Sequence, residues 1–341
     1  MRVYGVGSNM ICPVCKGDCL RAAEEVLGDV EKRYLSCRHC PPEPNLGKSI
    51  SGRLLPPRVE RCKSCGRASL DAIMLDALRL LQGFGLRDKD DGLRSVGMPL
   101  IDVGYPLAYS PRLGRDSLIL VGEKYSKAAA EAMVEEIAEI KGVIESRGVP
   151  GVVAPEKKPL KNLLLAGCDM RADVVSSLMG ELVVYRRQSQ IHIEFPRQNA
   201  PKMRILEELY FRGLLRDVAD GLCGPGTLGL MCVLAGAERV VFNDAWLPAI
   251  EDLLINLEVN RKLLEIEEIE LLERPREAAG SGTVQVARAR GACQIEVYHG
   301  DLCRLFSQAR PAELCLIDHF PGSDTEALQQ ACRCCKETVI V

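Results

Sequence analysis

The sequence predicts an α/β protein in which residues 201–341 form a mostly parallel sheet, preceded by a cysteine-rich module (1–67) and an α+β middle domain (68–200). Three observations support this prediction. Strand-like and helix-like segments alternate after residue 200, which is typical of a parallel sheet. A glycine-rich turn follows the first of these strands. Three Cys-x-x-Cys pairs fall within the N-terminal module.

Composition places the chain among ordinary globular proteins. Hydrophobic residues make up 47% and charged residues 27% of its 341 residues, which are common values. The formal net charge of −3 gives no global basic field for nucleic acid or for an acidic membrane surface. The sequence has no apolar run of about 18 residues and no signal-like start, so we expect a cytoplasmic protein with no membrane partner.

The cysteines of the N-terminal module predict metal binding rather than disulfides. Each C-x-x-C turn can aim two thiolates at one ion, and two turns complete a tetrahedral zinc site. The favoured zinc ribbon joins the first and third pairs, and the second pair is the alternative arm. Cys19 and His39 could extend the set to two sites, or the cysteines could hold an iron–sulfur cluster. The candidate ligands are Cys12, Cys15, Cys37, Cys40, Cys62 and Cys65.

The middle domain is expected to mix helices and strands. Apolar residues at helical spacing predict a helix over residues 68–84 and a long amphipathic helix over 124–146. The alternation within 181–196 predicts a β-hairpin. A basic cluster in and after this hairpin is either a solvated face or a phosphate-binding surface. Its members are Arg186, Arg187, Arg197, Lys202 and Arg204.

Four acidic residues fall at or beside the ends of successive predicted strands in the C-terminal part. Ligands of parallel α/β sheets bind at the C-terminal ends of the strands, near the point where the strand order reverses. Four acids at such ends are hard to explain as ordinary surface charge, so we expect them to surround a binding site. They are Asp220, Asp244, Asp301 and Asp318.

The glycine-rich stretch of residues 224–229 fits the G-x-G-x-x-G pattern of dinucleotide sites. A dinucleotide would bring a pyrophosphate to this loop, where Asp220 would repel it. S-adenosylmethionine carries no phosphate, and its ammonium would be attracted by the same acid. Asp244 can accept hydrogen bonds from ribose hydroxyls, and Asp301 can accept one from the adenine amino group. The residues therefore favour S-adenosylmethionine over the cofactor of an NAD-dependent oxidoreductase.

Four stretches, DGLCGPGTLGL, VVFNDAWLPAIEDLLINLEVN, HGDL and LIDHFPG, together resemble the ordered motifs of class I S-adenosylmethionine-dependent methyltransferases. The resemblance covers residues 201–341 and implies a Rossmann-like sheet of the methyltransferase type. The cofactor-binding residues that it implies are Asp220, Leu222, Gly224, Gly226, Asp244, Ala245 and Asp301.

The fourth motif of this resemblance concerns the chemistry. It implies that Asp318, His319, Phe320 and Pro321 face the transferred methyl group, where Asp318 or His319 would orient an acceptor nitrogen or take its proton. The structural alternative is that Asp318 caps the helix that follows.

The second motif is similar to that of archaeal tRNA guanine methyltransferases. With the zinc module and the basic hairpin, it makes a structured RNA such as tRNA the expected substrate, although His319 stands where that branch has a proline. The acidic balance, the few aromatic residues and the altered fourth motif favour a protein or small-molecule substrate instead, and the many free thiols suit an anaerobic archaeon. A non-catalytic metal-binding assembly factor is a third possibility. There is also a fainter resemblance to methyltransferase-like proteins grouped as methanogenesis markers.

Two departures from the family pattern affect the sheet. Residues 261–294 form a longer connection than usual and are expected to contain added strands. The sequence ends at the predicted fifth strand, ETVIV, without the final hairpin of the family. We expect the edge of this strand to be covered by a partner subunit, a second copy of the chain or the N-terminal part.

Overall fold

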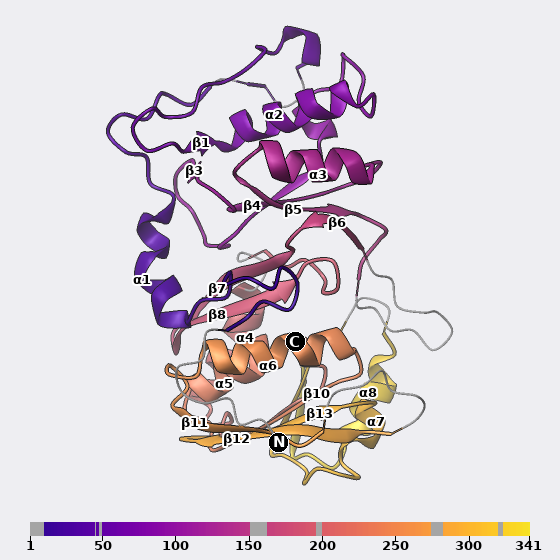
Figure 1. Cartoon of the computed structure of the whole chain (residues 1–341). Helices are drawn as coiled ribbons and strands as arrows, with labels where there is room; N and C mark the ends of the chain where they lie inside the picture. Colours follow the sequence, from indigo (N-terminus) through magenta and orange to yellow (C-terminus); the bar gives the residue numbers. More distant parts are fainter. Residues whose placement is uncertain are drawn as a thin grey trace.

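The computed structural model describes residues 10–44, 46–47, 50–150, 162–195, 200–273, 282–319 and 323–341. Figure 1 shows three levels: a small α/β layer at the top, a two-stranded hairpin in the middle and a large sheet at the bottom. Helices α4, α5 and α6 lie between the hairpin and the large sheet.

The large sheet has seven strands. Five of them run parallel in the spatial order third, second, first, fourth and fifth along the chain, which is the order of a doubly wound nucleotide-binding sheet. The order reverses between β9 and β14, so the switch point lies there. In spatial order the strands are β11 (Ile266–Leu271), β12 (Val284–Gly291), β13 (Gln294–His299), β10 (Arg239–Asp244), β9 (Asp217–Asp220), β14 (Leu314–Ile317) and β15 (Glu337–Ile340).

The two edges of this sheet correspond to the two predicted departures from the family pattern, added strands at one edge and a fifth strand at the other. Strands β11 and β12 are antiparallel additions beyond β13, which confirms the added strands expected in residues 261–294. At the opposite edge, β15 pairs with β14. No other strand of the described residues pairs with β15, so the described portion of the N-terminal part does not extend the sheet there.

Helices cover both faces of the large sheet. Successive strand residues point to opposite faces: Val240 and Phe242 join the core beneath α4, α5 and α6, whereas Val241 joins the core beneath α7. No helix formed by the described residues has both the length and the apolar character needed to cross a membrane. The helices are α4 (Ala200–Phe211), α5 (Thr227–Leu234), α6 (Leu247–Val259), α7 (Leu302–Leu305) and α8 (Thr325–Ala331).

The middle hairpin consists of antiparallel β7 (Met170–Ser177) and β8 (Gly180–Arg187). Two asparagine side chains of α6 join it to that helix. Asn256 accepts from Tyr185 N at 2.7 Å and donates to Tyr185 O at 3.0 Å. Asn260 makes the same pair with Val183, at 3.0 and 2.7 Å. These amides fix the hairpin on the helix that follows β10.

The upper layer is a four-stranded sheet with two helices on one face. Its strands β4 and β5 are parallel and are connected by α3, a βαβ unit. The strands are β2 (Met98–Ile101), β4 (Leu118–Gly122), β5 (Ile140–Glu145) and β6 (Leu163–Gly167). The helices are α2 (Leu70–Gly83) and α3 (Lys127–Glu136), and a short antiparallel pair, β1 (Ala68–Ser69) and β3 (Arg112–Leu113), lies nearby.

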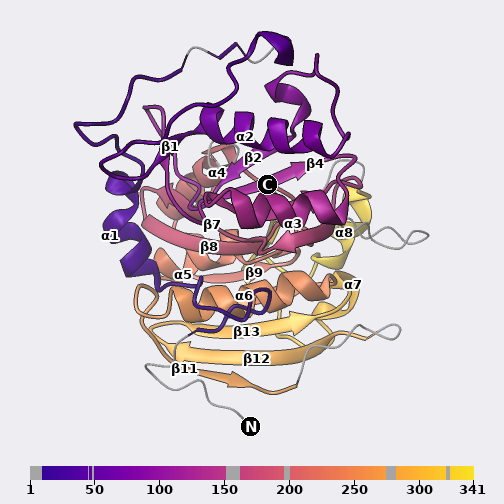
Figure 2. The same cartoon turned by 45° about the horizontal axis from the view of Figure 1, so that its top comes forward.

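The N-terminal helix α1 (Ala23–Arg33) runs from the upper layer down to the hairpin (Figure 2). Its Val26 and Val30 share an apolar cluster with Met170 of β7, Tyr185 of β8 and Val259 of α6. Apolar packing therefore crosses both predicted domain boundaries, near residues 67 and 200. The division into three domains stays a prediction.

Two predictions for the middle region are wrong. The helix expected over 124–146 ends at Glu136, and residues 140–145 form β5 instead. This segment is buried between two neighbouring strands, so burial in the sheet overrode its helical spacing. The predicted hairpin is also different, because β8 pairs with β7 rather than with residues 191–195. Ile193 and Phe195 instead pack as irregular chain against the second face of the upper sheet.

Candidate functional site

The glycine-rich loop connects β9 to α5 at the switch point of the large sheet. Gly224 and Gly226 have φ angles of 52° and 94°, in the left-handed region that favours glycine. A Cβ atom on Gly226 would also lie only 2.4 Å from Leu253 Cδ1 of α6. The two glycines therefore let the chain turn sharply into α5.

Asp220 ends β9 beneath this loop and is completely buried. Its Oδ2 accepts a hydrogen bond from Gly229 N at 2.9 Å, whereas its Oδ1 has no partner among the described residues. Burial raises the pKa of Asp220 to about 7, and the nearby carboxylates of Asp318 and Asp244 add to this effect. The group is thus partly ionised at neutral pH, with one oxygen left to meet a cation.

Asp244, at the end of β10, holds the loop in place. Its Oδ2 accepts from Gly224 N at 2.8 Å and its Oδ1 accepts from Trp246 N at 2.7 Å. Burial raises the pKa of this carboxyl, and the two backbone hydrogen bonds oppose that rise. His299 Nδ1 at the end of β13 lies 2.9 Å from Asp244 O. Asp244 therefore contacts the glycine loop through its carboxylate and the end of β13 through its backbone carbonyl.

The remaining residues of the predicted cofactor set lie around these strand ends. Asp301 follows β13 and caps the one-turn helix α7, its Oδ1 accepting from Cys303 N at 2.9 Å. Leu222 in the glycine loop packs partly buried against the core on the α7 side of the sheet. Ala245 is exposed directly after β10.

Asp318 follows β14 on the other side of the switch point. Its Oδ2 lies 2.5 Å from Lys202 Nζ at the start of α4. Burial raises the pKa of Asp318, and the Lys202 charge opposes this rise. Asp318 is not the cap of the following helix, because Asp324 fills that role by accepting from Ala327 N at 3.0 Å. His319 is half-buried beside Asp318, whereas Phe320 and Pro321 lie outside the described residues.

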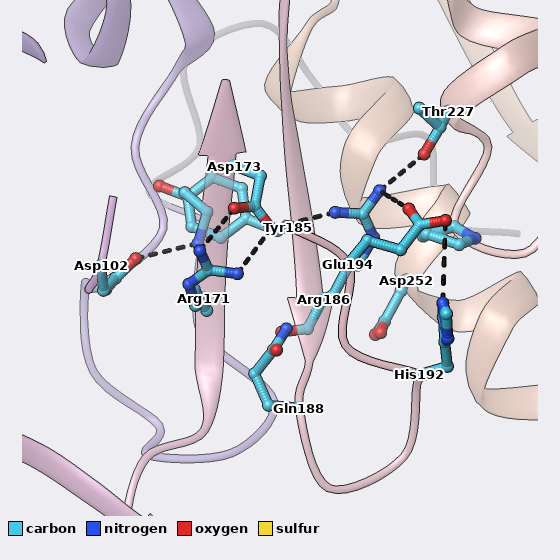
Figure 3. A network of polar contacts seen from close by, with 12 residues as sticks. Asp102, Arg171, Asp173, Tyr185, Arg186, Gln188, His192, Glu194, Thr227 and Asp252 are labelled. Carbon is cyan, nitrogen blue, oxygen red and sulfur yellow. Dashed lines mark hydrogen bonds and ion pairs between the residues drawn. The ribbon is translucent and has the colours of Figure 1, made fainter. Parts of the chain in front are cut away.

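A chain of buried ion pairs leads from the hairpin to the glycine loop (Figure 3). Arg186 of β8 is completely buried. Its Nη1 donates to Asp173 of β7 at 3.0 Å. Its Nη2 donates to Glu194 at 2.9 Å and to Thr227 Oγ1, at the start of α5, at 2.7 Å. A single guanidinium thus joins β7, residue 194 and the helix that the glycine loop opens.

Glu194 connects this chain to Asp318. Its Oε1 lies 2.7 Å from Lys202 Nζ, so Lys202 bridges the two acids. Burial disfavours ionisation of Glu194, but the charges of Arg186 and Lys202 outweigh it and lower its pKa. Burial lowers the pKa of the neighbouring His192, which favours its neutral imidazole. Sequence reasoning missed Glu194 and His192 because they sat inside an alternating apolar pattern.

The basic cluster predicted near residues 186–204 is not a continuous phosphate-binding surface. Arg186 and Lys202 belong to the internal network described above. Arg187 is also paired internally, with Asp252 at 2.7 Å and Glu251 at 2.8 Å. Arg204 is exposed, and Arg197 lies outside the described residues. Acidic partners, some near in the sequence and some distant, therefore neutralise most of this cluster.

Eight of the 16 cysteines form two groups of four thiols. Within each group all the Sγ atoms lie within 4.8 Å of one another. One group, the hairpin cluster, contains Cys12, Cys15, Cys19 and Cys168; the other, the local cluster, contains Cys37, Cys40, Cys62 and Cys65. Both groups could hold a metal ion, since thiolates are ligands for zinc and iron.

These groups correct the favoured pairing. The first and third C-x-x-C pairs do not share a site: Cys62 and Cys65 join the second pair, which was the alternative arm. His39 is not a member of either group, and its Nε2 accepts from Arg38 Nε. Cys168 was not expected, because a single cysteine 149 residues after Cys19 gives no spacing signal.

No family model and no curated protein sequence matches the chain. Among solved structures, the chain is similar to aTrm5 in complex with tRNALeu, at 16% identity over 79% of this chain and 62% of that one, with a TM-score of 0.41. It is also similar to Trm1 from Pyrococcus horikoshii with S-adenosyl-L-methionine, at 23% identity over 48% of this chain and 39% of that one, with a TM-score of 0.36. A third similar structure is Trm5b from Pyrococcus abyssi, at 15% identity over 79% of this chain and 80% of that one, with a TM-score of 0.38.

The chain spans less than two thirds of the length of the first two of these proteins. At these identities and TM-scores, its function has to be inferred from its own residues.

Proposed function

We propose that the chain is an S-adenosylmethionine-dependent methyltransferase. The observation that carries this proposal is the buried carboxylate of Asp220, which has one unpartnered oxygen beneath a glycine loop at the switch point. A pyrophosphate at that loop would meet a like charge. The methionyl ammonium of S-adenosylmethionine would meet an opposite one, directly or through water. The charge of Asp220 thus distinguishes this cofactor from a dinucleotide.

The other loop residues fit the same cofactor. Gly224 and Gly226, with Leu222 between their loop and the core, would line the methionine end. Asp244 and Ala245 would lie along the ribose, and Asp301 would accept from the adenine amino group. Asp244 already positions the loop through Gly224 N, so its free lone pairs would meet a ribose with little rearrangement. When bound, the cofactor supplies a methyl group on an already activated sulfonium.

The residues around Asp318 would act on the methyl acceptor. Direct displacement requires the acceptor, the carbon and the leaving sulfur to be aligned, so orientation is the main contribution of the protein. Asp318, held by Lys202, would accept a hydrogen bond from the acceptor nitrogen or take its proton. We assign His319 to the wall of the same acceptor site.

For the substrate we propose a structured RNA such as tRNA. The second motif that resembles archaeal tRNA guanine methyltransferases supports this choice. Its paired asparagines, Asn256 and Asn260, have a physical role here, since they fix the hairpin beside the cofactor loop. The basic hairpin no longer supports RNA binding, so the metal-binding N-terminal region is the proposed contact with the RNA.

The local cluster is proposed to bind zinc. Cys37 Sγ lies 3.6 Å from Cys62 Sγ and 3.7 Å from Cys40 Sγ, and Cys40 Sγ lies 3.7 Å from Cys65 Sγ. Four sulfurs placed tetrahedrally about 2.3 Å from one zinc ion would be about 3.8 Å apart, so the spacing fits. Four thiolates leave no open position, so this zinc would have a structural role.

The first test is calorimetric titration of the zinc-loaded protein with S-adenosylmethionine, S-adenosylhomocysteine and NAD. We expect binding of the first two and not of NAD. Asp244→Ala should weaken S-adenosylmethionine binding about 10- to 100-fold, because it removes a ribose acceptor and frees the loop. The matched control is Asp324→Asn at the cap of α8, outside the site, which should bind normally. A folded protein that binds neither sulfonium nor thioether cofactor contradicts the methyltransferase proposal.

The second test identifies the substrate. Methyl-labelled S-adenosylmethionine is incubated with the protein and with separate RNA and protein fractions. Label that is released by ribonuclease and absent with Asp318→Asn supports RNA methylation. Label that resists ribonuclease and is released by protease would leave the cofactor proposal intact and contradict the RNA substrate.

A further inference from the structure

We propose that the hairpin cluster, Cys12, Cys15, Cys19 and Cys168, binds a second metal ion, a single zinc, that fastens the N-terminal segment to the start of β7. Three of the thiols belong to one tight turn near the N-terminus, within residues 12–19, and the fourth lies between β6 and β7. The inference does not depend on the proposed methyltransferase activity.

The sulfur positions fit one tetrahedral ion. Cys168 Sγ lies 3.7 Å from Cys12 Sγ and 3.9 Å from Cys19 Sγ, and Cys15 Sγ lies 3.6 Å from Cys19 Sγ. These separations agree with the value of about 3.8 Å expected around zinc. In an iron–sulfur cubane each thiolate binds a different iron, which would hold the four sulfurs farther apart. The spacing therefore favours a single ion.

The backbone gives independent support. Cys12 N donates to Gly17 O and Lys16 N donates to Cys12 O, both at 3.0 Å. The turn that begins at Cys62 in the local cluster repeats these two hydrogen bonds, at 2.9 and 2.8 Å. Lys16 and Gly66 occupy the same position in the two turns, with φ angles of 59° and 71°. Lys16 thus adopts a conformation that residues other than glycine rarely take. The turn at Cys12 therefore has the same backbone shape as the turn at Cys62.

Burial and charge also fit a bound cation. Cys12 and Cys168 are 0% and 5% exposed, and buried thiolates require compensation. Zinc would supply two positive charges. Lys141, itself buried, donates to Asp102 at 2.6 Å and interacts electrostatically with Cys19 and Cys168. This lysine would offset part of the negative charge that remains on a four-thiolate zinc site.

The position of Cys168 gives the ion its effect on the fold. The next residue, Asp169, accepts from Ser189 N through Oδ2 at 2.8 Å, which closes the open end of the hairpin. On the N-terminal side, Arg21 N donates to Tyr185 Oη of β8 at 3.1 Å. One ion would therefore hold α1 and the hairpin together across about 150 residues of chain.

The test is the zinc content of the full-length protein purified under reducing conditions. We expect two zinc ions per chain in the wild type and one in either Cys168→Ser or Cys15→Ser. Cys15 is exposed, so its substitution removes a ligand without opening the core. The matched variant Cys65→Ser in the local cluster should also leave one, and Cys15→Ser with Cys65→Ser should leave none. Cys334→Ser, outside both clusters, should keep two.

Cobalt replacement provides the second readout. Two equivalents of Co²⁺ should develop the absorption of tetrahedral thiolate sites in the wild type, and one equivalent in Cys15→Ser. A wild type that binds one ion, lost entirely in Cys65→Ser, overturns the proposal. So does a full complement of two ions in both Cys15→Ser and Cys168→Ser.

Discussion

The large sheet and the hairpin layer above it are stabilised in different ways. The core between the sheet and its helices is apolar, with Val218, Phe242 and Leu316 completely buried. The hairpin is attached through buried polar groups, among them Arg186 and Asn256. The hairpin also places Val175, Leu182 and Val184 in the apolar core, but its buried polar contacts are few and each is costly to break.

The strongest test of this difference is Arg186→Met. It leaves the buried carboxylates of Asp173 and Glu194 without their shared cation, which should lower the free energy of unfolding by about 3–5 kcal/mol. The comparison variant is Ile250→Val in the apolar core, expected to cost about 1 kcal/mol. Urea unfolding followed by circular dichroism measures both. Equal losses in the two variants would remove the distinction between the regions.

The second test concerns the asparagines of α6. Asn256→Ala leaves Tyr185 N and O without side-chain partners, which should cost about 2–3 kcal/mol because both groups are buried. Hydrogen exchange of the Tyr185 amide should accelerate, while the Val183 amide, held by Asn260, keeps more of its protection. Gln294→Ala, at an exposed position of β13, is the control and should change stability by less than about 0.5 kcal/mol. An unchanged exchange rate of the Tyr185 amide would contradict the role assigned to Asn256 in holding the hairpin on α6.

The smallest effect is a pH dependence of cofactor binding through Asp220, the buried carboxyl beneath the glycine loop. The fold raises the pKa of Asp220 from 3.8 to about 7 by burial. The contribution of this group to stability is therefore greatest below its unfolded pKa and declines as the pH rises towards 7. Binding of a cation requires the ionised form, so affinity for S-adenosylmethionine should be about tenfold weaker at pH 6 than at pH 8.

Asp220→Asn is the control for this dependence and should show a flatter profile between pH 6 and pH 8. Asp244 and Asp318 also have raised pKa values through burial, so any slope that remains in the variant belongs to them. A wild-type affinity that does not change over this range would contradict the role assigned to Asp220.

The sequence predicted the sheet better than the layers above it, for a physical reason. Strands such as β10 and helices such as α6 are specified by local apolar patterns. Residues 140–145 became a strand because of their neighbours in the sheet, which no local pattern records. For the site, the acids at the strand ends were predictable from the alternation of elements. Glu194 and Cys168 were not, because only tertiary contacts bring them into place.

Within the described residues β15 pairs only with β14, and its other edge has a consequence for how the protein behaves at high concentration. An unpaired parallel edge is a template for a strand from another molecule. Two ion pairs lie at the start of β15. Lys336 pairs with Glu313 at 2.5 Å, and Arg212 pairs with Glu337 at 2.9 Å. An incoming strand would have to approach past these charged side chains, which discourages self-association. Lys336 lowers the pKa of Glu313, and protonation of Glu313 at low pH would weaken this protection and favour aggregation through the edge.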